Sequence, residues 1–431
     1  MAKKTKAADL SIEEKLEQAL VVPGYEPYKI PDNWCWTNLK TVCNLDNGIK
    51  HNNESLVYFD AKTLREITEP VSRNSGVIVE KGQKVILVDG ENSGEVFVIP
   101  DRGYMGSTFR ILNISKHFDE MYIRYFIDIF REELKKNKIG SAIPHLNKEL
   151  FYGLQFPLPP LPEQQRIVER IESLFSKLDE AKEKAQEAID SFETRKAAIL
   201  HKAFSGELTA KWREENGVGI DEYPVYRFSE VAEIKSNLVD PAEYQDYPHI
   251  APDNIEKKTG VLLDYHTIRE DGVTSGKHRF YPGQILYSKI RPNLSKLVIV
   301  DFDGLCSADM YPIEAKGDTK CLWYYMLSEE FLEQASSAGS RSVLPKINQK
   351  ELSALRIRMP SSIDEQKEIS RLLDSLIEKE YQSKQVAESV IDQIDAMKKA
   401  ILARAFRGEL GTNDPEEESA VELLKQILSG E

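Results

Sequence analysis

The feature that most constrains this chain is an internal duplication. Residues 163–208 align without a gap with residues 365–410, at a constant offset of 202 positions, and 19 of the 46 aligned pairs are identical. The shared blocks include AIL at 198–200 and 400–402, and GEL at 206–208 and 408–410. Fainter matches precede each copy, such as Gly82-Gln83 with Gly283-Gln284. The chain therefore reads as two copies of one design, which predicts a pseudo-two-fold molecule.

Each copy of the repeat has the pattern of a long helix. In the first copy, apolar residues from Ile167 to Ile199 alternate spacings of four and three, and Arg195 is the one interruption. The second copy keeps this heptad seam but places Glu380 and Ser383 in its middle. Because an exposed apolar seam is unstable in water, we predict that the two helices pair within the chain as an antiparallel coiled coil.

The repeats alternate with two longer segments, whose short apolar runs and Gly- and Asn-rich loops predict mixed α/β domains. The expected fold class is therefore α+β, with two mixed α/β domains alternating with two long helices. We expect, in order, an N-terminal helical segment at 1–27, the first α/β domain at 28–156, a helical spacer at 157–212, the second α/β domain at 213–358, a second helical spacer at 359–410, and an acidic tail with a short helix at 411–431.

The charge of the chain is unevenly distributed. Its formal net charge of −14 at first argues against a nucleic-acid partner, but residues 409–431 alone carry seven acidic residues and one lysine. A DNA-binding protein needs only a local basic surface. A DNA partner therefore remains compatible with the composition.

The sequence shows no motif for membrane insertion, secretion or thiol redox chemistry. No apolar run approaches the roughly 20 residues needed to cross a bilayer, and the N-terminal segment lacks the apolar core of a secretory signal. The four cysteines form no C-x-x-C pair. We therefore expect buried thiols in a protein of the reducing cytoplasm, with no membrane partner.

One segment of the second domain concentrates basic residues. Residues 272–296 contain five lysines and arginines, one histidine and no acid, in a chain with 71 acidic residues. Arg and Lys can neutralise phosphates or donate to guanine O6 and N7, and Asn can pair with adenine. The candidate DNA contacts are Lys277, His278, Arg279, Lys289, Arg291, Asn293 and Lys296. The alternative is a solvated basic face, with the DNA surface lying around Arg341 and Lys346 instead.

The first domain offers weaker candidates in polar loops, and a solvated loop is an equal alternative for each. They are Lys50, His51, Arg73, Asn74 and Asn92. When Gly82 is aligned with Gly283, three pairs fall opposite each other: Gly90 and Arg291, Asn92 and Asn293, and Glu95 and Lys296. This difference in charge predicts that the two domains read different bases, and a carboxylate in this loop would accept a hydrogen bond from cytosine N4.

Motifs for catalysis are weak or absent. The segment from Gly272 to His278 resembles a phosphate-binding loop, but it is one residue short and has His278 where Ser or Thr would hold magnesium. Asp303, Glu314 and Lys316 can be drawn as a nuclease set, although such spacings arise readily by chance. The seven histidines have no metal-ligand spacing. We therefore expect no catalytic residue and no metal site.

The order of domains and the repeat motifs resemble one protein family. PLPPLPEQQRIVERIESLF at 157–175 and KAAILHKAFSGELTAKW at 196–212, with second copies at 365–377 and 398–410, resemble the helical spacers of type I restriction–modification specificity subunits. The second copy departs from the pattern where MPSS at 359–362 replaces the proline-rich start. The resemblance covers essentially the whole chain, and its target-recognition domains would correspond to residues 28–156 and 213–358.

The resemblance implies a non-catalytic subunit that binds a bipartite, asymmetric DNA site. Each recognition domain would read one half-site in the major groove, and the helix pair would set their separation. The implied partners are double-stranded DNA, two modification (adenine methyltransferase) subunits, and restriction subunits with translocase and nuclease activity. S-adenosylmethionine, ATP and Mg²⁺ would belong to those partners, and this chain would bind no cofactor.

Two alternatives from other functional classes stay open. One is a coiled-coil adaptor without direct DNA binding. The other is a magnesium-dependent nuclease that uses Asp303, Glu314 and Lys316.

Overall fold

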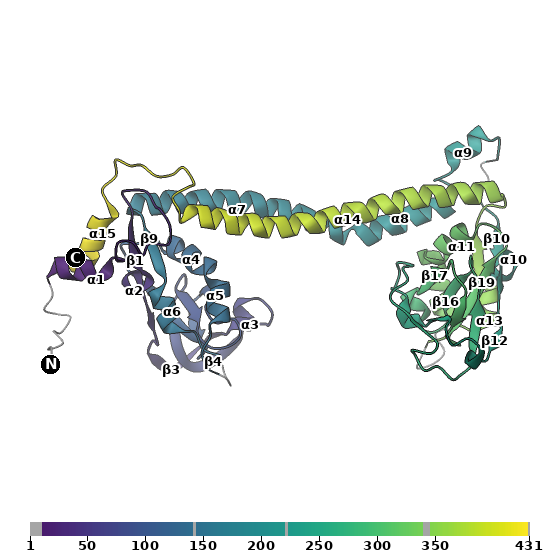
Figure 1. Ribbon diagram of the computed structural model, residues 1–431, viewed down its shortest axis with the longest axis horizontal. Coiled ribbons are helices and arrows are strands. Elements are labelled where there is room, and N and C mark those ends of the chain that lie inside the picture. Colours follow the sequence, from purple (N-terminus) through teal and green to yellow (C-terminus); the bar gives the residue numbers. More distant parts are fainter. Residues whose placement is uncertain (1–10, 141–143, 220–222, 339–344, 430–431) are drawn as a thin grey trace. The chain divides into compact units, whose positions relative to one another are not determined.

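The computed structural model describes residues 11–140, 144–219, 223–338 and 345–429. The chain divides into two compact units, Met1–Lys184 with Val390–Glu431, and Ala185–Ser389. Each unit contains one α/β domain and parts of both helical repeats (Figure 1). The predicted alternation of α/β domains and long helices is confirmed.

The first α/β domain contains three groups of strands. A two-stranded sheet has the order β1-β9, a four-stranded sheet the order β2-β8-β5-β6, and β3, β4 and β7 form a closed barrel. The strands are β1 (Cys35–Asn38), β2 (Cys43–Asp46), β3 (Lys50–Phe59), β4 (Val71–Val79), β5 (Lys84–Leu87), β6 (Val96–Val98), β7 (Gly103–Met105), β8 (Phe109–Ile114) and β9 (Gln155–Leu158). The helices of this unit outside the repeats are α1 (Ile12–Ala19), α2 (Leu39–Val42), α3 (Ala61–Leu64), α4 (Glu120–Ile129), α5 (Arg131–Lys136), α6 (Lys148–Gly153) and α15 (Ala420–Ser429).

The second α/β domain repeats this plan with more numerous, shorter strands. Its sheets have the orders β10-β20, β11-β19-β16-β17 and β12-β15-β18-β13-β14. The strands are β10 (Val225–Arg227), β11 (Ala232–Ile234), β12 (Leu238–Val239), β13 (Pro248–Ile250), β14 (His266–Thr267), β15 (Lys277–Phe280), β16 (Ile285–Ser288), β17 (Leu297–Ile299), β18 (Gly304–Cys306), β19 (Met310–Ala315) and β20 (Arg356–Arg358). The helices are α9 (Ala210–Glu215), α10 (Phe228–Val231), α11 (Thr319–Met326), α12 (Glu329–Ala338) and α13 (Gln349–Ala354), with 3-10 turns η2 (Pro241–Glu243), η3 (Pro252–Asn254) and η4 (Pro292–Leu294).

Strand register shows that the duplication runs through the α/β domains as well. Lys84 pairs with Val98 in the first domain, and Ile285 pairs with Ile299 in the second, so both partners lie 201 positions later. The same offset relates the pair Val79–Gly103 to the pair Phe280–Gly304. The two domains therefore share one scaffold, although their aligned sequences match only faintly.

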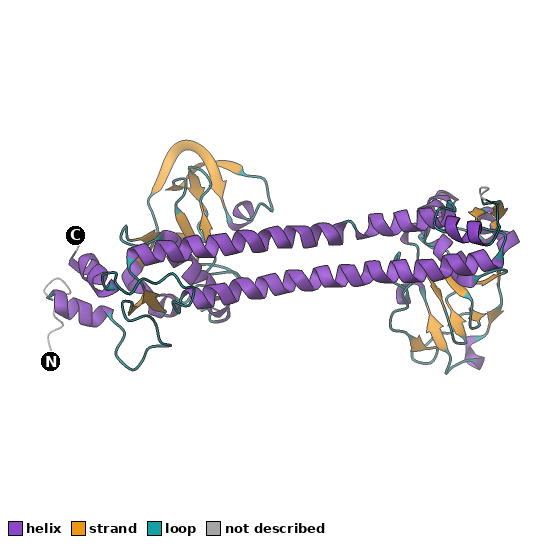
Figure 2. Ribbon diagram, turned by 90° about the horizontal axis from the view of Figure 1, so that it is seen from above, coloured by secondary structure: helices purple, strands orange, loops and turns teal. Residues whose placement is uncertain are grey.

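The helical repeats form α7 (Leu161–Asp190), α8 (Phe192–Phe204) and α14 (Ile363–Ala405). In the first unit, Lys182 pairs with Asp395 and Asp179 with Lys398, so residue numbers rise in one helix as they fall in the other. In the second unit, the Phe192 and Tyr381 rings lie 4.9 Å apart. The predicted antiparallel pairing is confirmed, and Figure 2 shows the long helices side by side within each unit.

The first repeat is not the single helix that its heptads predict, because it is interrupted at Ser191 between α7 and α8. The Ser191 hydroxyl donates a hydrogen bond to the carbonyl oxygen of Glu187 at 2.7 Å. Such side-chain bonds to the preceding turn compete with the helical ladder and bend helices. Arg195, seven residues further along the chain, donates to the carbonyl oxygen of Ala188 at 3.1 Å, so its side chain spans the interruption.

The end of each repeat binds the beginning of the other through a buried glutamate. Thr412 donates to the fully buried Glu163 at 2.7 Å in the first unit, and Thr209 donates to the buried Glu365 at 2.8 Å in the second. Burial raises the pKa of Glu163, and the hydrogen bonds from Thr412 and Arg166 oppose that shift. The pseudo-two-fold relation predicted from the repeats is thus present in their hydrogen bonds.

The glutamine after each of these glutamates ties its helix to the adjoining α/β domain. Gln164 accepts a hydrogen bond from the Asp119 amide at 2.9 Å and donates to the carbonyl oxygen of Pro159 at 3.0 Å. Gln366 makes the same two bonds, with the Asp318 amide at 2.9 Å and the Pro360 carbonyl oxygen at 2.8 Å. Each domain is therefore fixed to the start of the helix that follows it.

The four cysteines are buried and unpaired with one another, as the sequence predicted. Burial raises the pKa of the Cys35 and Cys43 thiols to about 12, so they are unreactive at neutral pH. Among the residues that the structure describes, none of the helices combines the length and apolar content needed to span a bilayer.

Candidate nucleic-acid interface

The loop between β16 and β17 presents two of the predicted DNA contacts to solvent. The Ser288 amide donates to the Lys296 carbonyl oxygen at 2.9 Å and closes the base of the loop. Arg291 and Asn293 are exposed at its tip. The Arg291 backbone has a φ of 47°, and its amide donates to the Pro345 carbonyl oxygen at 2.7 Å. The loop is thus anchored by its backbone, while both side chains remain available.

The equivalent loop of the first domain has glycine at the strained positions. Gly90 has a φ of 107° and donates its amide to the Pro144 carbonyl oxygen, as Arg291 does to Pro345. Gly94, with a φ of 98°, corresponds to Ser295, with a φ of 46°. A side chain in this left-handed region costs roughly 1 kcal/mol or more, which glycine avoids. In the second domain this cost accompanies an arginine side chain at the tip of the loop.

Two lysines of the basic segment, Lys289 and Lys296, contact acceptors of the domain itself. Lys296 donates to the Pro252 carbonyl oxygen at 2.7 Å and lies 3.5 Å from the Asp253 carboxylate. Lys289 donates to the Ala308 carbonyl oxygen, and burial lowers its pKa. The segment has no acid of its own, but its neighbours in space supply acceptors.

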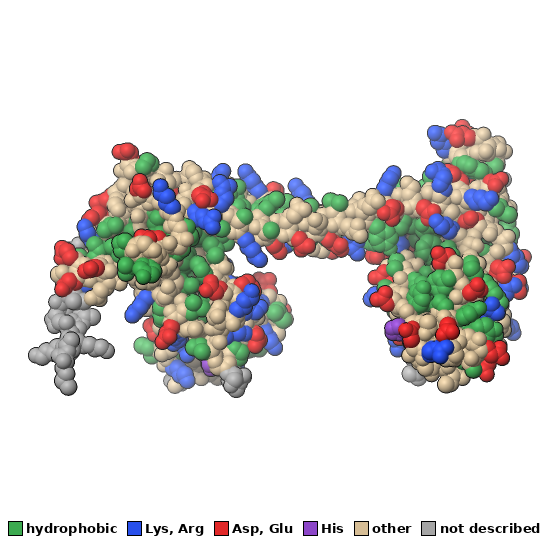
Figure 3. All heavy atoms as spheres, in the orientation of Figure 1, with side chains coloured by type: hydrophobic (Ala, Val, Ile, Leu, Met, Phe, Trp, Pro, Cys, Tyr) green, Lys and Arg blue, Asp and Glu red, His purple; other side chains and the backbone are tan. Residues whose placement is uncertain are grey.

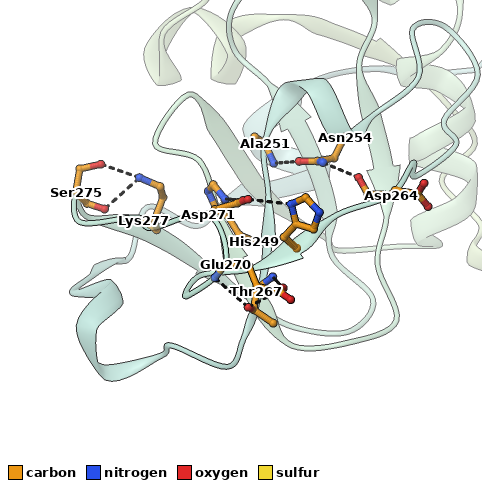
Figure 4. Close-up of polar contacts among 10 residues, drawn as sticks. His249, Ala251, Asn254, Asp264, Thr267, Glu270, Asp271, Ser275 and Lys277 are labelled. Carbon is orange, nitrogen blue, oxygen red and sulfur yellow. Dashed lines mark hydrogen bonds and ion pairs between the residues drawn. The ribbon is translucent and has the colours of Figure 1, made fainter.

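Lys277 and His278 lie in the interior rather than on a basic surface. Their exposed fractions are 7% and 4%. Lys277 donates to the hydroxyl of Ser275 at 2.7 Å and to its carbonyl oxygen at 3.1 Å (Figure 4). Burial lowers the pKa of both side chains. Strand β15 lies between β12 and β18, so this part of the basic segment belongs to the folded sheet rather than to an exposed loop.

Sequence reasoning missed a histidine–carboxylate cluster formed by β13, β14 and the residues that follow β14. Asp271 accepts a hydrogen bond from Nδ1 of His249 at 2.7 Å (Figure 4). It accepts a second from Nδ1 of His266 at 3.1 Å. The His249 contact, followed by that of His266, lowers the pKa of the Asp271 carboxyl. Since His249 and His266 are opposite each other in the β13–β14 pair, strand pairing assembles the cluster. Neither histidine has a sequence neighbour that signals this contact.

The predicted residues of the first domain gather mostly on one ribbon of two strands. Lys50 and His51 lie on β3, Arg73 and Asn74 lie on β4, and all four are exposed. Arg73 stacks on Tyr58, with its guanidinium carbon 3.4 Å from the ring centroid. A two-stranded ribbon fits the major groove of DNA. Asn92 is half-buried in the separate loop between β5 and β6.

The carboxylates of that loop are already paired. Asp89 accepts from His145 at 2.6 Å, Glu91 lies 2.7 Å from Lys138, and Glu95 lies 2.8 Å from Arg131. For one of these carboxylates to accept a hydrogen bond from cytosine N4, as expected, its present contact would have to break. On the face drawn in Figure 3, basic and acidic side chains are likewise interspersed rather than gathered in one basic field.

The residues of the nuclease alternative are engaged separately. Glu314 lies 3.1 Å from Lys235, Lys316 donates to the Ser229 carbonyl oxygen at 2.8 Å, and Asp303 is exposed before β18. Within the described part of the chain, no three His, Cys, Asp or Glu side chains are grouped as metal ligands. Of the second-choice DNA surface, Lys346 pairs with Asp309 at 3.0 Å, and Arg341 lies outside the described residues.

Comparison with known proteins identifies the scaffold. The family model described as type I restriction modification DNA specificity domain matches residues 31–190 and 220–389. The EcoDI type I restriction enzyme specificity subunit of Escherichia coli is 37% identical over 325 residues, which cover 69% of this chain and 73% of that subunit. The MjaVIII specificity subunit of Methanocaldococcus jannaschii is 24% identical over 374 residues, covering 78% and 81%.

Two solved structures share the fold. A chain from a study of complex assembly and conformational transition of the type I restriction–modification system superposes with a TM-score of 0.68 and 19% identity, covering 89% of this chain and 100% of that one. The HsdS subunit from Thermoanaerobacter tengcongensis gives a TM-score of 0.57 at 19% identity, covering 89% and 99%. At such identities the likeness concerns the fold alone.

Proposed function

This chain belongs to the family of type I restriction–modification specificity subunits, and we propose that its two recognition domains each read one half of a bipartite, asymmetric DNA site. The family match occurs twice, and each copy covers one α/β domain with the helix that follows it. Recognition of DNA sequence is therefore the function of the chain. Two different loops on one scaffold support the asymmetry, because Arg291 stands where the first domain has Gly90.

The chain acts without catalytic chemistry of its own in this proposal. S-adenosylmethionine, ATP and Mg²⁺ belong to the modification and restriction subunits, which supply methyl transfer, translocation and cleavage. The helical repeats carry two modification subunits and set the length of the nonspecific gap. In the first unit, α7 and α14 leave a groove of about 300 Å³ lined by Leu174, Leu178, Met397 and Ile401, which supports docking there.

A domain exchange tests the proposal. Residues 213–358 are replaced by the corresponding segment of a relative, and the chimera is assembled with its methyltransferase subunits. Mapping methylated adenines in the host genome should show one half-site changed and the other retained. Exchange of residues 28–156 is the matched control and should alter only the opposite half. If both halves change together, or if neither does, the modular assignment is wrong.

A further inference from the structure

Arg279 is held among three tyrosine rings. Its guanidinium carbon lies 4.9 Å from the ring centroid of Tyr281, 5.3 Å from that of Tyr244 and 5.8 Å from that of Tyr247. The rings of Tyr244 and Tyr247 pack edge to face at 5.2 Å. A cation facing aromatic rings is attracted by their quadrupoles. The three tyrosines thus hold the guanidinium in one place on the domain surface.

The backbone fixes all four members of this cage. Arg279 is the partly exposed residue of β15, whose other residues are buried, and its amide donates to the Asn237 carbonyl oxygen at 3.2 Å. Tyr244 follows the turn η2, and the Tyr247 amide donates to the Tyr244 carbonyl oxygen at 3.0 Å. Tyr281 directly follows β15 and is 42% exposed. The cage is therefore part of the folded domain rather than a chance contact of flexible side chains.

The arginine in the cage has no ion pair. Among the described residues, no Asp or Glu side chain pairs with Arg279, whereas nearby Arg269 lies 2.9 Å from Asp246. The Nε atom of Arg279 is buried and has no hydrogen-bond partner, so a ligand would be contacted by the terminal N–H donors of this partly exposed side chain. The planar guanidinium can donate two parallel hydrogen bonds to a pair of acceptors, whereas the ammonium of lysine acts as a point charge. Guanine presents such a pair, O6 and N7, in the major groove.

The first domain also has an arginine held by an aromatic ring, here a single tyrosine. Arg73 stacks on Tyr58 at 3.4 Å, is exposed, and likewise has no acidic partner among the described residues. Arg73 lies on β4 of the β3-β4-β7 barrel, and the register shows that β4 corresponds in its later part to β15. The two arginines occupy different positions on equivalent sheets. This difference is expected if the two domains recognise different half-sites.

We propose that Arg279, positioned by Tyr244, Tyr247 and Tyr281, reads a guanine in the half-site of the second recognition domain, with Arg73 on Tyr58 as its counterpart in the first. The inference rests on the proposed function and adds a specificity-determining side chain to each domain. The tyrosines are positioning residues, because they act through the arginine.

Arg279→Lys tests the proposal, because lysine keeps the charge but loses the planar fork. The complex with its methyltransferase subunits is offered duplexes in which each position of the mapped site is varied in turn. We expect discrimination at one guanine of one half-site to fall about 10- to 100-fold, with the other positions unchanged. Arg73→Lys should do the same in the opposite half-site. Arg269→Lys, at the ion-paired arginine of the same domain, is the matched control and should change nothing.

The tyrosines give a second, independent readout. Tyr281→Leu removes a ring at an exposed position and should weaken discrimination at the same guanine, whereas Tyr281→Phe keeps the ring and should restore it. If Arg279→Lys and Tyr281→Leu both retain full discrimination, Arg279 is a phosphate contact or a structural residue and the proposal fails. If the wild-type complex shows no sequence preference in either half-site, the proposed function itself is wrong.

Discussion

Arg291 occupies a backbone conformation that its counterpart in the first domain fills with glycine. Its φ of 47° is costly for any residue with a Cβ, so Arg291→Gly should raise the stability of the domain by up to about 1 kcal/mol. The same change should weaken DNA binding by the assembled complex. Thermal unfolding and duplex binding are the measurements. Ser295→Gly relieves similar strain and should leave DNA binding intact. A loss of stability in Arg291→Gly would show that the side chain itself supports the loop.

The sequence predicts the alignment of this loop but not its contacts. The match of Gly82 with Gly283 aligns Gly90 with Arg291, and the strand register has the same offset. The acceptors of Lys296 lie about 43 residues earlier in the chain, and two of the three rings around Arg279, those of Tyr244 and Tyr247, come from a distant turn. Side chains that meet only through strand pairing leave no local pattern, so the basic segment reads as uniformly exposed when part of it is buried.

His278 should make the second domain sensitive to mild acid. Burial, followed by the charge of Lys289, lowers the pKa of His278 below its ordinary value of 6.5. The unfolded chain takes up a proton near that value while the folded chain resists it. Stability is therefore complete above about pH 6.5 and declines as the pH falls through it. His278→Gln should flatten this decline in unfolding midpoints measured between about pH 7.5 and 5.5. An unchanged slope would place the titrating group elsewhere.

At the scale of elements, the two charged residues that interrupt the heptad seam pair with each other. Arg195 interrupts the first copy and Glu380 the second, and they form an ion pair of 2.7 Å. In the sequence, each of these residues only interrupts the apolar seam of its own helix. Neither helix alone determines the register in which the two helices pair. The heptads predict an antiparallel pair, whereas the partner of each seam position emerges only from the structure.

A double-mutant cycle tests that pair. Arg195→Ala and Glu380→Ala should each destabilise the helix pair, and the double variant should lose less than the sum, with a coupling of about 0.5–1 kcal/mol for this partly exposed contact. Hydrogen exchange of the α8 amides is the measurement, since it reports local opening of these helices. Lys182→Ala with Asp395→Ala is a comparison at a more exposed pair. If the stability losses of the two single variants are fully additive in the double variant, the attraction between Arg195 and Glu380 does not stabilise the helix pair.

At the scale of the whole molecule, each of the two units joins the start of one repeat to the end of the other. Each buried glutamate at the start of one repeat accepts a hydrogen bond from a threonine after the end of the other. The α1 and α15 helices add a further link, with the Lys15 ammonium 3.5 Å from the Leu428 carbonyl oxygen. The sequence predicts the two-fold repeat, but these links depend on isolated residues outside the heptads and could not be foreseen from the heptads.

Adding one heptad to both helices tests whether the repeats measure the gap between half-sites. Insertions near Ala185 in α7 and Asp392 in α14 keep the seam in frame and lengthen the pair by about 10 Å, or about three base pairs. We expect the mapped methylation site to keep both half-sites with a longer gap, or methylation to be lost. Four residues near Ala185 alone break the heptad frame and should be more damaging. Full methylation with an unchanged gap in the paired insertion would reject the helices as the determinant of spacing, since the half-sites would then be positioned by something other than helix length.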